Sequence, residues 1–180
     1  MTQPPLSGAQ QYPPAVYAPA VPGDLTSAPP ASLLRWFSST AAAGIVVGAL
    51  WWCLAPGGAF YGSGSDTAVW LPRDLVLGLI GLVAGIVTAA LLLPQRRNAG
   101  SYTKILAAVA GSAAGSVIAW RLGTLAGDLW GHVPANPASD SIAFSLRSVS
   151  VLTLWPGICA LIIFAVTLVS LLRSGPSDQK

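Results

Sequence analysis

The stretch LVLGLIGLVAGIVTAALLL, residues 75–93, decides the fold class of this chain. It contains no charged residue, and a membrane-spanning helix needs about 20 mostly apolar residues. Proline and charged residues border it on both sides, in the segments 72–74 and 94–97. We therefore predict a transmembrane helix over residues 75–93.

The composition of the whole chain agrees with a membrane location. Of its 180 residues, 53% are hydrophobic and only 8% are charged, whereas a soluble domain carries about 25% charged residues. The mean hydropathy is +0.65. So few charges cannot cover a water-exposed surface, which excludes a soluble enzyme, and so apolar a chain is not disordered throughout. The composition predicts a small multi-pass membrane protein.

Three more segments are apolar and long enough to contribute membrane spans, two of them free of charged residues and one containing only Arg121. Trimmed at proline and glycine, the four predicted helices cover residues 37–55, 75–93, 105–127 and 149–172. The third runs through Arg121, because the charge-free part alone, residues 105–120, is too short to span a bilayer. We predict an all-α fold, a four-helix transmembrane bundle with its membrane domain over residues 33–173.

The two ends of the chain differ from this domain. Residues 1–32 hold eight prolines and no apolar periodicity, and proline opposes both helix and sheet. We predict a disordered cytoplasmic tail over 1–32 and a short cytoplasmic tail over 174–180. No basic residue precedes Arg35 and no apolar core lies near the N-terminus, so we expect no cleavable signal peptide.

The distribution of basic residues predicts the orientation. With the N-terminus inside, the cytoplasmic segments hold Arg35, Arg96, Arg97, Lys104, Arg173 and Lys180. The external loops then hold only Arg73 and Arg147, and cytoplasmic loops are usually the richer in Lys and Arg. We expect both termini in the cytoplasm of a bacterium and the helices in its plasma membrane. The basic residues are scattered, so we expect no nucleic-acid partner.

Small residues recur at every fourth position of the third predicted helix: Ala107, Gly111, Gly115, Ala119, Gly123 and Gly127. We call this row the small-residue ladder. The first predicted helix repeats the spacing at Gly44 and Gly48, and the second repeats it at Gly81 and Gly85. Small residues at this spacing let two helix backbones approach closely in a membrane. The ladder is either a dimerisation surface or, as we favour, a packing surface within the bundle.

Arg121 is the one ionisable residue well inside a predicted span. A charge near the bilayer centre costs about 2.5–3.5 kcal/mol on insertion scales, so it normally has a partner or water. Asp128 lies on nearly the same helix face, and Asp74 opens the second helix on the same side. We favour an ion pair with Asp128 or Asp74; the alternative is a contact with a substrate or anion in an outward-facing vestibule.

Pro156 lies inside the fourth predicted helix, where it removes a backbone hydrogen bond to Leu152 and predicts a kink. Transporters use such breaks, usually in matched pairs, but no second break is present here. Cys53, Cys159 and His132 stand in unrelated places and do not form a metal site. We expect no catalytic residues, no cofactor and no metal.

Three short motifs resemble a family of actinobacterial membrane proteins described as a domain of unknown function. They are LIGLVAG at residues 79–85, AWRLG at 119–123 and LTLWP at 152–156, and the resemblance extends over about residues 45–172. Membership implies a four-helix plasma-membrane protein with no assigned activity and no catalytic residues to carry over.

These observations lead to two hypotheses about function. The first is a non-enzymatic accessory or scaffold protein in the lipid bilayer, packing against itself or against a larger membrane complex, because packing surfaces are plentiful and reactive groups are lacking. The alternative is a small transporter or channel that uses Arg121 and the helix break at Pro156.

Overall fold

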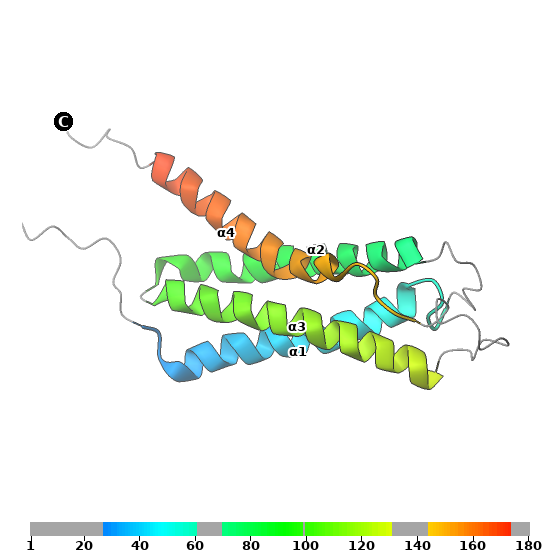
Figure 1. Ribbon diagram of the computed structural model, residues 1–180. Helices are drawn as coiled ribbons and strands as arrows, with labels where there is room; N and C mark the ends of the chain where they lie inside the picture. The colour runs from blue at the N-terminus through cyan, green and yellow to red at the C-terminus, as the bar shows by residue number, and fades with distance from the viewer. Residues whose placement is uncertain (1–26, 61–69, 99, 131–143, 174–180) are drawn as a thin grey trace, which may run out of the picture.

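The computed structural model describes residues 27–60, 70–98, 100–130 and 144–173, and this part of the chain contains no strand (Figure 1). Four α-helices make up most of it: α1 (Pro30–Leu54), α2 (Trp70–Leu92), α3 (Ser101–Trp130) and α4 (Leu154–Arg173). Two short 3₁₀ helices, η2 (Leu93–Arg97) and η4 (Val149–Thr153), follow α2 and precede α4. The predicted all-α four-helix bundle is confirmed.

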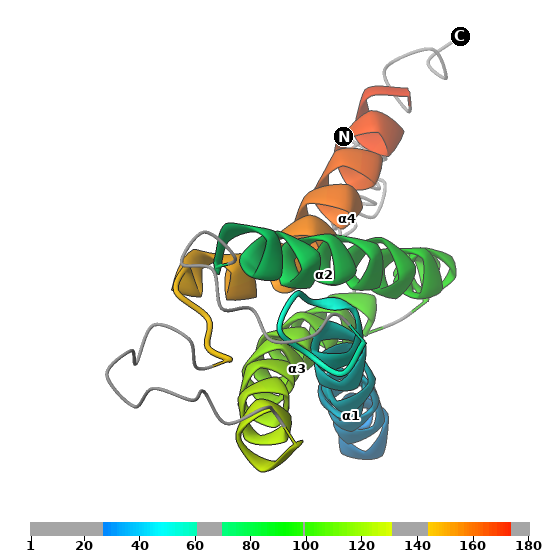
Figure 2. The same cartoon turned by 90° about the vertical axis from the view of Figure 1, so that its right-hand side faces the viewer.

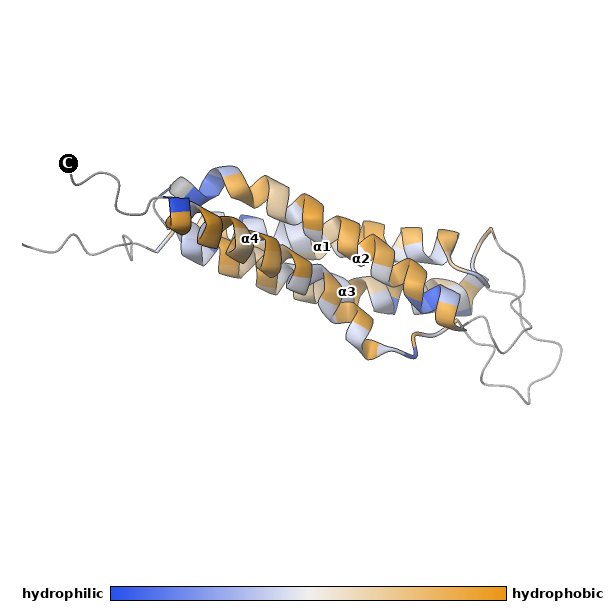
Figure 3. Ribbon diagram, turned by 90° about the horizontal axis from the view of Figure 1, so that it is seen from above, coloured by the Kyte–Doolittle hydropathy of each residue, from blue (hydrophilic) through white to orange (hydrophobic). Residues whose placement is uncertain are grey.

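Each of the four helical segments is long enough and apolar enough to cross a membrane. Large apolar side chains such as Leu79 and Phe164 are exposed on the outside of the bundle. Hydrophobic residues cover most of the length of the four helices, and most of the strongly hydrophilic ones lie toward the helix ends (Figure 3). Such an outer surface suits lipid rather than water. The fold is that expected of a multi-pass membrane protein.

Successive helices run in opposite directions, so α1 begins at the same end of the bundle at which α4 finishes (Figure 1). α1 and α3 lie side by side as the most closely packed pair. α2 crosses this pair, and α4 packs mainly against α2, also contacts α3 near its own start, and leans outward toward its C-terminus (Figures 1 and 2). The bundle therefore consists of a tight α1–α3 pair, with α2 and the start of α4 packed against it and the rest of α4 less enclosed.

The first helix begins at Pro30 rather than at residue 37, inside the segment that we predicted as tail. Proline fits the first turn of a helix, where its missing N–H would have no acceptor within the helix. Just before the helix, the backbone N–H of Ala28 donates to Oγ1 of Thr103 at 3.1 Å, which ties this segment to α3. The rest of the predicted N-terminal tail, residues 1–26, and the C-terminal tail, 174–180, lie outside the described residues.

The fourth span changes helix type just before Pro156. A 3₁₀ turn occupies Val149–Thr153, and the α-helix begins at Leu154, which makes Pro156 its third residue. The first four N–H groups of an α-helix have no acceptor within that helix. Pro156 therefore removes no α-helical hydrogen bond, in contrast to the predicted loss of a bond to Leu152, and the change of helix type lies two residues before it.

Candidate functional site

The small-residue ladder of α3 faces α1. Gly44 lies against the backbone of Gly115, and a Cβ placed on Gly48 would lie 2.6 Å from the carbonyl oxygen of Ala119. Real Cβ atoms essentially never come that close, so only glycine fits at Gly44 and Gly48. The two helices touch through their backbones, as small residues permit.

The other ladder positions also face the inside of the bundle. A Cβ on Gly111 would lie 2.5 Å from the carbonyl oxygen of Phe37, Gly123 lies under the ring of Trp51, and Gly127 lies against Phe144. Ala107 is half-buried. The ladder is thus used within one chain, as the packing interpretation expects, and is not left as an open face for a second copy.

Trp155 connects three helices near the middle of the bundle. Its indole Nε1 donates to Oγ1 of Thr88 on α2 at 3.1 Å, and both groups are buried. Its ring also packs against Gly115 of α3, where an added Cβ would lie 3.0 Å from Cζ3. The backbone of α4 approaches α2 at Gly85, since a Cβ there would lie 2.9 Å from the carbonyl oxygen of Trp155. This single side chain therefore fixes α4 against the α1–α3 pair.

A second buried tryptophan, Trp51, closes the end of the bundle at which α1 and α3 finish. Its Nε1 donates to the backbone carbonyl of Arg73 at 2.9 Å, and its ring centroid lies 4.7 Å from that of Phe144. Nearby, the ring centroids of Trp52 and Trp130 lie 5.6 Å apart. We call this the aromatic end. Aromatic rings of this kind gather at membrane–water interfaces.

Two charged side chains are buried at the aromatic end, Arg73 at 4% exposure and Asp74 at 3%. Nε of Arg73 donates to the carbonyl oxygen of Pro56 at 3.1 Å, and its guanidinium lies 4.7 Å from the ring centroid of Phe144. Oδ2 of Asp74 accepts a hydrogen bond from the backbone N–H of Ser148 at 2.8 Å. We call these two residues with their contacts the polar cluster; it joins the segment after α1, the first turns of α2 and the segment before η4.

This cluster is not predicted by the sequence pattern, which places Arg73 in an external loop and Asp74 at the start of the second helix. In the structure α2 begins at Trp70, so both residues lie within the helix. The buried Oδ1 of Asp74 has no hydrogen-bond partner in the described part of the chain. Through Arg73 and through Oδ2 of Asp74, the cluster holds three segments of the chain together.

The structure does not bring Arg121 to either predicted partner. Its side chain is exposed on α3, with the guanidinium 4.5 Å from the ring centroid of the adjacent Trp120. Asp128 is also exposed, and seven residues along a helix is a rise of about 10 Å, too far for a direct contact. Asp74 binds Ser148 instead. Among the described residues Arg121 therefore forms no ion pair with Asp128 or Asp74.

Metal-binding groups do not gather in the described residues, which contain no set of three or more His, Cys, Asp or Glu side chains close enough to hold an ion. Cys159 is fully buried in an apolar cluster with Ala89, Leu92 and Ile163, and Cys53 is half-buried. His132 lies outside the described residues. The two cysteines act here as packing groups.

Comparison with known proteins adds no relative: no family model, no curated protein and no solved structure matches this chain. The resemblance to actinobacterial membrane proteins therefore stays a prediction.

Proposed function

We propose that this chain is a non-enzymatic accessory or scaffold protein of the bacterial plasma membrane that acts by packing against another transmembrane protein. The buried polar side chains support this proposal, because Thr88 and Trp155 join α2 to α4 and Asp74 joins α2 to the segment before η4. The tightly packed α1–α3 pair then supports the bundle, and α4 carries the surface that contacts the partner.

The observation that carries the proposal is the outer face of α4. Trp155, Cys159 and Ile163 are the buried residues of this helix, and they lie on the side toward α2. The opposite side presents an exposed row at i, i+4, i+7 and i+11: Gly157, Leu161, Phe164 and Leu168. We call this row the α4 outer face. Apart from its own helix backbone and its two chain neighbours, no atom of the described residues lies within 4 Å of a Cβ placed on Gly157, so a partner helix can approach closely there.

Site-specific photo-crosslinking in the native membrane tests this proposal. A photoreactive residue replaces Phe164 on the outer face or, as a control, Leu79 on α2; both side chains are 64% exposed. We expect a discrete crosslink to one membrane protein from position 164 and only lipid products from position 79. Gly157→Leu should abolish the crosslink while leaving the fold intact, because its side chain meets open space. Ala110→Leu, at an exposed position of α3, should leave it unchanged.

Failure of this test would favour the alternative function. If positions 164 and 79 react only with lipid, and the purified protein conducts ions or solutes in liposomes, the small transporter or channel replaces the scaffold. Substitution of Arg121 should then change the flux, whereas a scaffold has no flux to change.

The proposed orientation has its own test. We expect reporters joined after Gln95 and after Lys180 to be cytoplasmic, and reporters near Gly64 and Ala138 to be outside, because the cytoplasmic segments hold the larger share of Lys and Arg. An external reporter after Gln95 would reverse the assignment of both termini.

A further inference from the structure

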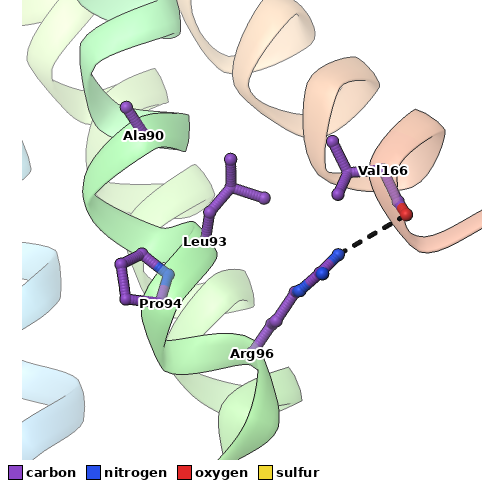
Figure 4. Close-up of a pocket in the computed structure, with 5 residues that line it drawn as sticks. All are labelled: Ala90, Leu93, Pro94, Arg96 and Val166. Atoms are coloured by element: carbon purple, nitrogen blue, oxygen red, sulfur yellow. Dashed lines mark hydrogen bonds between the residues drawn. The ribbon is translucent and has the colours of Figure 1, made fainter. Parts of the chain in front are cut away.

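A cavity of about 420 Å³ lies between the C-terminal parts of α2 and α4, where α4 leans away from the other helices (Figures 1 and 4). Four apolar residues line it together with one arginine: Ala90, Leu93, Pro94, Val166 and Arg96. Arg96 ends the membrane-spanning stretch of α2 and η2, so its guanidinium lies at the depth of lipid headgroups. The cavity therefore combines an apolar wall with one cation at the membrane surface.

The local structure directs Arg96 toward this cavity. Pro94 lies in the first turn of η2, where the chain changes from α-helix to 3₁₀ helix. Nη1 of Arg96 then donates to Oγ of Ser170 on α4 at 3.1 Å and makes a longer contact, 3.5 Å, with the carbonyl oxygen of Val166 (Figure 4). A guanidinium has five N–H donors, and the other nitrogens of Arg96 bind no group in the described chain.

The described charged side chains at this end of the bundle all have one sign. Besides Arg96, the described side chains at this end include Arg35 near the start of α1, Lys104 near the start of α3 and Arg173 at the end of α4. Both described carboxylates, Asp74 and Asp128, lie in the helix turns at the aromatic end. We call the end with Arg96 the basic end. Its positive charge has no counterpart within the described residues and is complementary to an anionic ligand.

We propose that the cavity binds one anionic phospholipid, with its phosphate on the guanidinium of Arg96 and an acyl chain against Leu93 and Val166. Basic pockets between transmembrane helices bind anionic headgroups in this manner. A free phosphate ion would use the cation but not the apolar wall, whereas a lipid uses both. The bound lipid fills the opening between α2 and α4 and keeps α4 tilted away from the other helices.

Lipid titration of the purified protein in a mild detergent tests this inference. The binding of phosphatidylglycerol, phosphatidylcholine and inorganic phosphate is measured at equal phosphate concentration by native mass spectrometry and by the shift in thermal unfolding temperature. We expect saturable binding and stabilisation by phosphatidylglycerol alone. Arg96→Gln should weaken that binding by about five- to tenfold, the size expected for one basic group at an anionic surface. Arg35→Gln, the matched loss of an exposed arginine at the same end, should weaken it by less than about twofold.

A second pair of variants keeps the charge and fills the space. Ala90→Phe should block the cavity and lower phosphatidylglycerol binding although Arg96 is intact. Ala110→Phe, at an exposed position of α3 away from the cavity, should leave the binding unchanged. Equal binding of phosphatidylcholine and phosphatidylglycerol would overturn the inference. Equal losses from Arg96→Gln and Arg35→Gln would also overturn it, as would full competition by inorganic phosphate, which would reveal an ion site. Asp178→Asn tests whether a carboxylate of the C-terminal tail, rather than a lipid, occupies the cavity. Tighter binding of phosphatidylglycerol to this variant would show that the tail competes for Arg96, and would refute the assignment of the cavity to a lipid.

Discussion

Gly44→Ala tests the close contact between α1 and α3 with the smallest possible change. A Cβ at this position would lie 2.7 Å from both the Cα and the carbonyl carbon of Gly115. Carbon atoms in contact prefer about 3.5–4.0 Å, so the two helices would have to separate by about 1 Å. The obstructing atoms belong to the backbone, and no side-chain rotation relieves them. Overpacking of this kind costs about 1–3 kcal/mol of unfolding free energy.

Gly81→Ala is the matched control, because it is the same substitution at another buried position within a membrane-spanning helix. The nearest atoms to a Cβ at Gly81 are N and Cβ of Trp155, at 3.8 and 3.9 Å, which is ordinary contact. Replacing glycine by alanine in a helix gains up to about 1 kcal/mol of helix propensity. Gly81→Ala should therefore be neutral or stabilising, while Gly44→Ala destabilises.

The measurement is the free energy of unfolding in mixed micelles, by titration with a denaturing detergent and detection of tryptophan fluorescence. The quantity of interest is the difference between the two variants, expected at about 1–3 kcal/mol with Gly44→Ala the less stable. If Gly44→Ala is as stable as Gly81→Ala, then α1 and α3 do not meet at this residue, and the assignment of the ladder to internal packing is wrong.

Two further predictions concern the polar groups. Thr88→Val removes the acceptor of the Trp155 indole and should lower the free energy of unfolding by about 1–3 kcal/mol. Thr167→Val is the control and should change it little, because the Thr167 hydroxyl bonds only to its own helix. Equal losses in the two variants would show that the hydrogen bond between α2 and α4 does not contribute to stability. Arg73→Gln should lower the free energy of unfolding by about 1–3 kcal/mol, because it loses buried contacts. Arg121→Gln should change it by no more than about 0.5 kcal/mol, because that side chain is exposed. A larger loss from Arg121→Gln than from Arg73→Gln would show that Arg121 on α3 is the arginine that stabilises the fold.

The helices themselves could be predicted from the sequence, because a membrane span is determined locally by its own apolar composition. The predicted span 75–93 agrees with α2 (Trp70–Leu92) to within a turn or so at each end. The start of α1 could not be located from composition, because proline is common both in disordered segments and in the first turn of a helix, so Pro30 does not distinguish the two. Boundaries are set by which backbone groups find partners, and such partners are distant in the sequence.

The polar cluster shows this dependence on distant partners most clearly. Arg73 and Asp74 follow a proline and precede an apolar run, a pattern typical of an exposed helix flank. Their burial depends on Pro56, which follows α1, and on Phe144 and Ser148, which lie between α3 and η4. No periodicity within residues 70–80 indicates that these two segments cover Arg73 and Asp74. Only the tertiary contacts distinguish Arg73 from an ordinary interfacial arginine.

The position of Arg121, in contrast, follows from a pattern already present in α3. Ala119 and Gly123 belong to the ladder, and Arg121 lies two residues from each, about 200° around the helix from either one. Once the ladder is directed at α1, Arg121 must be directed away from it, and the structure places it there over Trp120. Gly44 and Gly48 of α1 are four residues apart, as are Gly115 and Ala119, which they meet. Gly81 and Gly85 of α2 have the same spacing, so the spacing alone does not select α1; the tertiary contacts do, and they place Arg121 on the face of α3 that points away from α1.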